Sequence, residues 1–304
     1  MIALLTESDV RAALSWEELI PAMARALADF SAGRVVQPTR SWLTLEEGQR
    51  HLGVMPAATD RAAGLKFVSL FQKNEGTRLP TVMATVLLVD PQTGEPLALV
   101  DGTFLTAMRT AAVSAAVADA IAPRAASVLA ILGSGVEAAT HLEAIRSIRT
   151  IREVRIWSRT PAHAAAFADR HGAKAMSAEQ AVRGADIIVC ATATHTAVLL
   201  GAWLKPGAFV ASIGAPSPTW REVDDAAMAN VVVVDSRDAS LAEAGDVIQS
   251  RATIYAEVGE IFAGTKQVPA GATVIFKSNG LAVEDVVAAQ LVVERSLASD
   301  HRPS

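Results

Sequence analysis

The chain has 304 residues, a formal net charge of −5, 51 % hydrophobic and 19 % charged residues, and one cysteine. This composition is ordinary for a compact α/β protein with two domains, and it argues against a nucleic-acid or membrane partner, because the chain has no basic excess. One cysteine excludes an intramolecular disulfide, and the first residues lack the pattern of a signal peptide. We therefore expect a cytoplasmic protein that acts on small molecules.

The first region is predicted to be a mostly antiparallel sheet with helices. The run Ser15-Trp16-Glu17-Glu18 predicts a capping box at the start of a helix that continues to about Phe30. A hairpin-type connection over residues 90–94 is predicted between the last two of five strands, which cover residues 39–45, 51–57, 65–70, 81–89 and 97–100. A long alanine-rich helix over residues 104–122 then leads into the next region.

From Ala126 onward, strands and helices alternate, which predicts a parallel, doubly wound sheet. The predicted strands cover residues 128–132, 154–157, 186–191, 209–213, 231–235 and 273–276. A final helix over residues 283–296 is expected to fold back on the first region. The predicted fold is thus α/β, with a central Rossmann-type domain (119–282) inserted in an α+β domain (1–118 plus 283–304).

The central region carries a glycine-rich turn between a strand and a helix. Gly133, Gly135 and Ala138 follow the apolar run 128–132 and precede a helical stretch over residues 136–149. In a βαβ unit the first glycine permits a tight turn, the second lets a pyrophosphate approach the backbone, and the small third residue lets the helix pack closely. A dinucleotide is therefore the predicted ligand.

The turn after the second strand of this unit predicts which dinucleotide binds. An NAD site usually has an acidic residue here, whereas this chain has Ser158, Arg159 and Thr160. A guanidinium can pair with the 2′-phosphate of NADP, so NADP(H) is the preferred cofactor and NAD(H) the alternative. The other interpretation of Arg159 is a solvated arginine at the end of a turn.

Three cations of the first region lie in or beside apolar segments. Arg40 opens a predicted strand, Lys66 lies inside one, and Arg109 lies in the alanine-rich helix. Together such groups could hold a substrate carboxylate, although each one alone is more often salt-bridged or extends to the surface. The six histidines form no metal-binding pattern, so we expect no metal site, and Cys190 is interpreted as a buried structural thiol.

Eight short strings resemble the ornithine cyclodeaminase/mu-crystallin family. They are GLKFV (64–68), LPTVMATV (79–86), DG (101–102), MRTAA (108–112), GSGVEA (133–138), SIGA (212–215), EAGD (243–246) and FKSNGLAVED (276–285). The resemblance implies a homodimer whose first domain binds substrate and forms the dimer, with NAD(P) bound by the central domain and the active site between the two.

The resemblance also implies roles for individual residues. Arg40, Lys66 and Arg109 would bind the carboxylate of an amino or imino acid, and Lys66 and Arg109 are the predicted catalytic residues. The predicted cofactor-binding residues are Gly133, Ser134, Gly135, Val136, Glu137, Ser158, Arg159, Thr160, Thr192, Ile213 and Gly214.

One departure from the family pattern bears on the reaction. Cyclodeaminases of the family have an aspartate directly after SIGA, where this chain has Pro216, and Trp220, Arg221 and Glu222 further on resemble mu-crystallin. We therefore expect an NAD(P)H-dependent reductase of a cyclic imino acid such as 1-pyrroline-2-carboxylate. The alternatives are ornithine cyclodeamination, with Asp224, Asp225 or a residue from another loop in place of the missing aspartate, alanine-type dehydrogenation, and a non-catalytic NADPH-binding protein.

Overall fold

The computed structural model describes residues 2–300, with side chains described up to residue 297. The chain forms two compact units: unit 1 comprises Met1–Arg109 and Leu281–Ser304, and unit 2 comprises Thr110–Gly280. The chain passes from unit 1 to unit 2 inside helix α3 (Gly102–Ile121) and returns just before helix α11 (Ala282–Asp300). The expected boundary at residue 118 lies in the same helix, nearer its C-terminus, because α3 is continuous and contributes to both units.

Unit 1 contains a six-stranded sheet in the order β1-β6-β5-β4-β3-β2. All neighbours are antiparallel except β1 and β6. The predicted hairpin is present, with the N–H of Asp90 donating to the carbonyl of Glu95 at 2.9 Å. Strand β1 was not predicted, because three residues are too short to establish a periodicity. The strands are β1 (Ala3–Leu5), β2 (Ser41–Glu46), β3 (Arg50–Ala58), β4 (Ala63–Phe71), β5 (Val82–Val89) and β6 (Pro96–Asp101).

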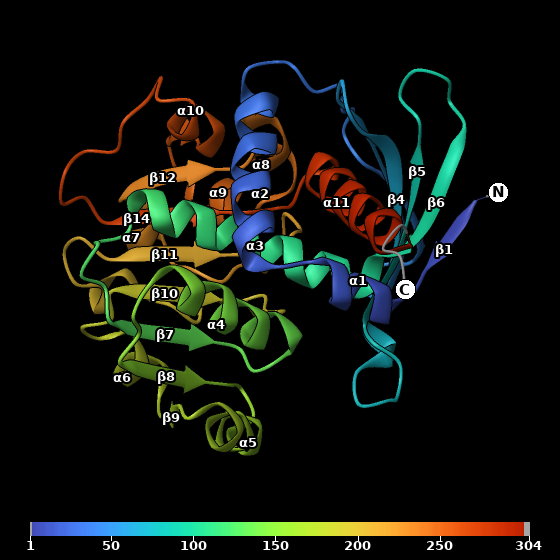
Figure 1. Cartoon of the computed structure of the whole chain (residues 1–304). Helices are drawn as coiled ribbons and strands as arrows, with labels where there is room; N and C mark the ends of the chain where they lie inside the picture. The colour runs from blue at the N-terminus through green and yellow to red at the C-terminus, as the bar shows by residue number, and fades with distance from the viewer. Residues whose placement is uncertain (1, 301–304) are drawn as a thin grey trace. The chain divides into compact units, whose positions relative to one another are not determined.

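Helix α11 packs on one face of this sheet, in contact with strands β3, β4 and β5 and with helices α1 (Glu7–Ala13) and α2 (Trp16–Ser31) (Figure 1). The C-terminal helix therefore does return to unit 1, as expected. Helix α2 begins where predicted, but the capping box is wrong, since no side chain caps it at Ser15. The carboxylate of Glu18 is instead engaged by Arg295 of α11, an interaction between residues far apart in the sequence.

Unit 2 is a parallel eight-stranded sheet in the order β13-β12-β14-β11-β10-β7-β8-β9, with its strands side by side in Figure 1. The six predicted strands are found within one residue at each end. From β7 the chain proceeds to β8 and β9 on one side, then returns to β10 and β11 on the other side. The strands are β7 (Val128–Leu132), β8 (Glu153–Trp157), β9 (Lys174–Ala175), β10 (Ile187–Cys190), β11 (Phe209–Ser212), β12 (Val231–Val234), β13 (Ile254–Glu257) and β14 (Val274–Lys277).

Short helices connect these strands. They are α4 (Val136–Ile148), α5 (Pro161–His171), α6 (Ala178–Val182), α7 (Asp225–Met228), α8 (Arg237–Glu243), α9 (Gly245–Ser250) and α10 (Val258–Phe262). The strand order reverses between β7 and β10, and at such a reversal the loops diverge and leave a crevice at the carboxyl edge of the sheet. Unit 2 is thus the predicted Rossmann-type fold, and its carboxyl edge is where a dinucleotide is expected.

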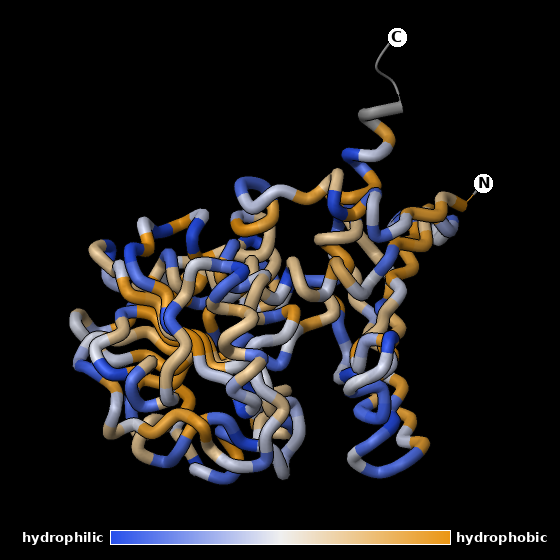
Figure 2. The backbone as a smooth tube through the Cα atoms, turned by 90° about the horizontal axis from the view of Figure 1, so that it is seen from below, coloured by the Kyte–Doolittle hydropathy of each residue, from blue (hydrophilic) through white to orange (hydrophobic). Residues whose placement is uncertain are grey.

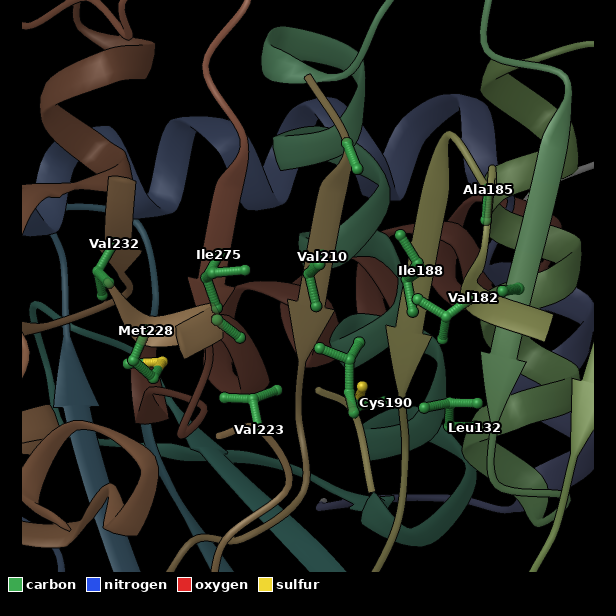
Figure 3. Close-up of a cluster of buried hydrophobic side chains, with 14 of the residues drawn as sticks. Leu132, Val182, Ala185, Ile188, Cys190, Val210, Val223, Met228, Val232 and Ile275 are labelled. Carbon is green, nitrogen blue, oxygen red and sulfur yellow. The ribbon is translucent and has the colours of Figure 1, made fainter. Parts of the chain in front are cut away.

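Apolar side chains fill the space between the parallel sheet and its helices. Figure 3 shows side chains of four strands, Ile188, Val210, Val232 and Ile275, in one layer that is covered by Val182, Val223 and Met228. Figure 2 shows apolar segments running through unit 2 with hydrophilic segments at its periphery. Such continuous apolar strands are typical of a parallel sheet buried on both faces.

Two other expectations concern buried segments. Cys190 is fully buried in this layer, and burial, together with the charges of Glu222 and Asp246, raises the pKa of its thiol well above the ordinary value. It is therefore a structural thiol.

Helix α3 is long and apolar enough to cross a membrane, but most of it is buried within the protein, as is usual for a core helix.

Candidate active site

Gly133 directly follows strand β7 and has a backbone conformation that favours glycine. Its φ is +120°, and a Cβ atom there would overlap the carbonyl oxygen of Ala191 at the end of β10. Its N–H donates to the carbonyl of Trp157, at the end of β8, at 2.9 Å. The glycine-rich turn is thus held between the ends of the two neighbouring strands, where no side chain would fit.

The surroundings of Gly135 fit the pyrophosphate of a dinucleotide. A Cβ atom added at Gly135 would meet no heavy atom within 4 Å. Gly135 is the N-cap of α4, where no side chain of the described residues provides a capping bond. Open space in front of a helix N-terminus suits an anion, because the first amides and the helix dipole both favour negative charge.

The predicted turn after β8 lies beside the glycine-rich loop. The Ser134 hydroxyl donates to the Ser158 hydroxyl at 2.8 Å. Arg159 and Thr160 are exposed and directly precede α5. The side chain of Glu137, also a predicted cofactor residue, lies 3.5 Å from His141.

Thr192, Ile213 and Gly214 complete the row at the carboxyl edge. They follow β10 and β11, and the N–H of Ile213 donates to the Cys190 carbonyl at 3.0 Å. All the predicted cofactor residues of unit 2 therefore follow the ends of four adjacent strands, β8, β7, β10 and β11. This arrangement supplies backbone amides and hydroxyls along one line, which fits an extended dinucleotide.

A buried charged cluster, formed by Glu222, Asp246 and Lys277, lies beside this row. All three residues are 0 % exposed. The Glu222 carboxylate accepts from the N–H of Thr192 at 2.7 Å and from the N–H of Gly214 at 2.8 Å. Burial raises the pKa of Glu222, partly offset by the charge of Lys277. Two predicted cofactor residues are thus connected by a carboxylate to which the sequence interpretation assigned no role.

Unit 1 contains a second buried cluster, in which Lys66 pairs with Asp285. Lys66 is 2 % exposed on the inner face of β4, and its Nζ lies 2.7 Å from a carboxylate oxygen of Asp285 on α11. Burial lowers the pKa of Lys66 to about 8, a shift that Asp285 opposes and that Arg109 and Arg40 reinforce. The two arginines therefore lie near enough to Lys66 to act on its charge.

Arg109 joins the same cluster from helix α3. Its Nε lies 2.9 Å from the Asp285 carboxylate and its Nη1 lies 2.7 Å from Glu284, whose side chain is fully buried. Arg40 is half-buried just before β2, with its guanidinium 5.9 Å from the ring centre of Trp42. Lys66 and Arg109 thus meet at Asp285 and are both salt-bridged, while Arg40 acts on the charge of Lys66.

Five site residues had no role in the sequence interpretation: Asp285, Glu284, Glu222, Asp246 and Lys277. A signal existed for Lys277, because a lysine closing the apolar strand β14 is as unusual as the one in β4 that drew attention to Lys66. Glu284 and Asp285 open an apolar helix, where acidic residues are commonly favoured by the helix dipole. Their burial against β4 and α3 could not be read from that pattern.

The fold and these residues define a dinucleotide-binding protein with a Rossmann-type unit, whose other unit contains a buried cluster of cations and carboxylates. The chain matches the ornithine cyclodeaminase/mu-crystallin family over residues 2–300, and it belongs to that family. Ketimine reductase mu-crystallin of Mus musculus is 43 % identical over 285 residues, which cover 91 % of each chain. The resemblance found in the eight strings is thereby confirmed along the whole described chain.

Two solved structures share the complete fold. The Thermococcus litoralis Delta(1)-pyrroline-2-carboxylate reductase in complex with NADH and L-proline has a TM-score of 0.92 and 33 % identity, with 98 % of each chain covered. An archaeal alanine dehydrogenase dimer with bound NAD has a TM-score of 0.91 and 30 % identity, with 99 % of this chain and 98 % of that one covered.

Proposed function

We propose that the protein is an oxidoreductase that uses a nicotinamide cofactor to reduce the C=N bond of a cyclic imino acid to the cyclic amino acid. The observation that carries this proposal is the buried cluster of Lys66, Arg109 and Asp285 in unit 1, with Arg40 nearby. The similarity to a ketimine reductase and to a pyrroline-2-carboxylate reductase supports the reaction class.

The chemistry of the cluster suits a substrate carboxylate. Lys66 and Arg109 are paired with the internal carboxylates of Glu284 and Asp285, which offset the cost of burying the two cations and hold Arg109 in place. Ammonium and guanidinium groups held in this way would bind and orient the carboxylate next to the reacting C=N bond.

Lys66 is suited to hold and donate a proton. Its pKa of about 8 means that it is mostly protonated near neutral pH and yet releases the proton more readily than an ordinary lysine. Asp285 stabilises the ammonium form. We propose that Lys66 Nζ protonates the imine nitrogen; the reduced cofactor, when bound, supplies the hydride for the imine carbon.

Two observations favour reduction over cyclodeamination. Pro216 directly follows the string 212–215, where the family resemblance implies an aspartate in cyclodeaminases. Of the two carboxylates that could substitute, Asp224 accepts from the N–H groups of Ala227 and Gly201 as the cap of α7, and Asp225 pairs with Arg221. Both neighbouring carboxylates thus have structural partners.

Within this function we propose NADP(H) as the preferred cofactor, with NAD(H) as the alternative. The support is local: Ser158, Arg159 and Thr160 follow β8 in place of an acidic residue, next to the loop that suits the pyrophosphate. Arg159 is exposed and within the segment expected to approach the adenosine ribose.

We also propose a cytoplasmic homodimer that forms through the sheet of unit 1. On the face opposite α11, Phe67 is 44 % and Val54 38 % exposed, and the two are directly paired. The next row contains Pro56, Leu65 and Leu87, also in register. Contiguous apolar surface of this kind marks an interface, and the similarity to an alanine dehydrogenase dimer supports a second copy as the partner.

The reaction is tested with purified protein, NADPH or NADH, and 1-pyrroline-2-carboxylate. We expect loss of the absorbance of the reduced nicotinamide and formation of proline. Oxidation of alanine with release of ammonia would point to a dehydrogenase instead, and ornithine conversion to proline would point to a cyclodeaminase. Tight cofactor binding without turnover of any of these compounds would favour a binding protein.

A further inference from the structure

The buried charged cluster of Glu222, Asp246 and Lys277 has no part in the proposed hydride or proton transfer, yet it connects the loops at one half of the carboxyl edge. The Glu222 carboxylate accepts four hydrogen bonds. Besides the N–H groups of Thr192 and Gly214, the Thr192 hydroxyl donates at 2.6 Å and the Ser212 hydroxyl at 2.9 Å. The carboxylate therefore joins the loop after β10 to the loop after β11 through hydrogen bonds.

Asp246 and Lys277 hold this carboxylate in place. Asp246 accepts from the N–H groups of Glu222 at 2.8 Å and Val223 at 3.0 Å, and lies 3.1 Å from Lys277 Nζ. Lys277 also donates to the carbonyl of Gly214. The segment that carries Glu222 is thus fixed from α9 and β14, so that the position of Gly214 is set through both its N–H and its carbonyl.

The two loops joined by Glu222 lie so close together that position 214 has no space for a side chain. A Cβ atom on Gly214 would overlap the carbonyl of Thr192 and the carboxylate of Glu222. The next residue, Ala215, has a φ of 54°, a conformation that costs a non-glycine residue free energy and persists when its surroundings determine it. The local backbone is therefore held in one arrangement by the cluster.

The sheet order indicates which half of a dinucleotide meets these loops. The pyrophosphate loop follows β7, and the ribose-contacting turn follows β8 on one side of it. The strand order reverses on the other side, so a dinucleotide that spans the crevice extends toward β10 and β11. Thr192 and Gly214 therefore lie at the nicotinamide half.

We propose that Glu222 is a positioning residue for the nicotinamide half of the cofactor, acting through Thr192 and Gly214. This inference rests on the proposed function, because it requires that unit 2 binds a nicotinamide dinucleotide. Glu222 has no role in binding the adenosine half, which lies over β7 and β8.

A carboxylate is needed for this role because it presents acceptors on both sides. One oxygen receives the two donors of Thr192 and the other receives Gly214 and Ser212. A glutamine of the same size would turn its NH₂ group toward one of the two backbone N–H groups, so the hydrogen bond to that N–H group would be lost. Protonation of Glu222 would impair it in the same way.

The test compares Glu222→Gln with wild-type protein in binding titrations of two ligands: the reduced dinucleotide, and ADP-ribose, which lacks nicotinamide. We expect Glu222→Gln to bind the dinucleotide about tenfold more weakly, as for loss of a hydrogen bond to a charged group, while its affinity for ADP-ribose changes less than about twofold. If NADPH binds more tightly than NADH, the 2′-phosphorylated form of ADP-ribose replaces ADP-ribose.

Asp235→Asn is the matched control. Asp235 is also fully buried in unit 2 and accepts from three backbone N–H groups, those of Ser236 at 2.8 Å, Asn279 at 2.6 Å and Gly280 at 2.8 Å, but it follows β12. Its replacement should leave the ratio of the two affinities unchanged. Equal weakening of both ligands by Glu222→Gln, or no weakening of either, would overturn the proposal, whereas failure of wild-type protein to bind any dinucleotide would overturn the proposed function itself.

A measurement on wild-type protein serves if Glu222→Gln does not fold. The groups that face Glu222 are Asp246 from α9, Lys277 from β14 and Cys190 from β10. Burial raises the pKa of Glu222, so acidification from neutral pH should weaken dinucleotide binding relative to ADP-ribose binding. Parallel change of both affinities with pH would contradict the proposal.

Discussion

Lys66 and Asp285 form a buried ion pair, with 2.7 Å between the ammonium nitrogen and a carboxylate oxygen, that ties strand β4 to helix α11. The same carboxylate group also receives Arg109, from the unit 1 end of helix α3. One aspartate thus brings together two cations from separate elements. The proposed chemistry of unit 1 depends on this arrangement.

The pKa of Lys66 predicts the alkaline limit of the reaction. Because the ammonium form is required and the pKa is lowered to about 8, kcat/KM for imine reduction should fall as pH rises through about 8. Lys66→Met should lose most activity at every pH. Lys66→Arg remains charged in this range, so a decline near pH 8 that persists in this variant would assign the limit to another group.

Removal of the shared carboxylate should destabilise unit 1. Asp285→Asn leaves Lys66 and Arg109 with less compensation for their burial, and we expect the free energy of unfolding to fall by about 3 to 5 kcal/mol. Denaturant titration measures this. Asp29→Asn, which breaks an exposed pair with Arg34, is the control and should cost less than about 1 kcal/mol. A similarly small fall in the free energy of unfolding for both variants would show that the buried pair contributes little to stability.

Cofactor preference should depend on Arg159. In Arg159→Ala the KM for NADPH should rise about tenfold while the KM for NADH changes little, because only NADPH carries the phosphate that a guanidinium would pair with. Arg152→Ala replaces another exposed arginine of unit 2 and should leave both values unchanged. An unaltered preference in Arg159→Ala would assign discrimination to other residues.

A charge on the exposed face of the unit 1 sheet should prevent dimer formation. Phe67→Glu places a carboxylate among apolar side chains that are proposed to be buried between two copies, and we expect a monomer in analytical ultracentrifugation. Leu241→Glu changes a residue that is 61 % exposed on α8 and should leave the dimer intact. If wild-type protein is already a monomer, the proposed interface is wrong.

His141 should make unit 2 sensitive to acid. Its Nδ1 lies 2.7 Å from the Glu137 carbonyl and must donate, so its Nε2, 3.0 Å from the Ser114 hydroxyl, accepts. Burial lowers the pKa to about 4 from 6.5, and the unfolded chain therefore binds more protons between these values. Stability should fall by roughly 2 kcal/mol between about pH 7 and about pH 5.

The variant His141→Leu isolates this contribution. It has no titrating group at the site, so its unfolding free energy should depend less on pH than that of wild-type protein, by the same amount. Identical pH dependence of the two proteins would mean that folding leaves the pKa of the imidazole unchanged.

The sequence by itself determined the architecture of unit 2 and predicted where its cofactor would bind. The apolar runs that become β7, β10, β11, β12 and β14 are each buried on both faces, and that environment leaves a continuous local signal. Gly133 is likewise a local requirement of a tight turn, and Gly135 leaves open space in front of α4. The cations Arg40, Lys66 and Arg109 were also recognisable from local sequence, because a charged residue in or beside an apolar segment is unusual whatever its partner is.

Only the tertiary structure decided which groups compensate those charges. Asp285 pairs with Lys66, Arg295 pairs with Glu18, and Glu222 accepts from Thr192, in each case across at least 30 residues of sequence. Such pairings depend on which distant segments the fold brings together, whereas the hydrophobic pattern of the sequence indicates only whether a side chain is buried. Burial of a charge was therefore predictable, but the identity of its partner required the fold.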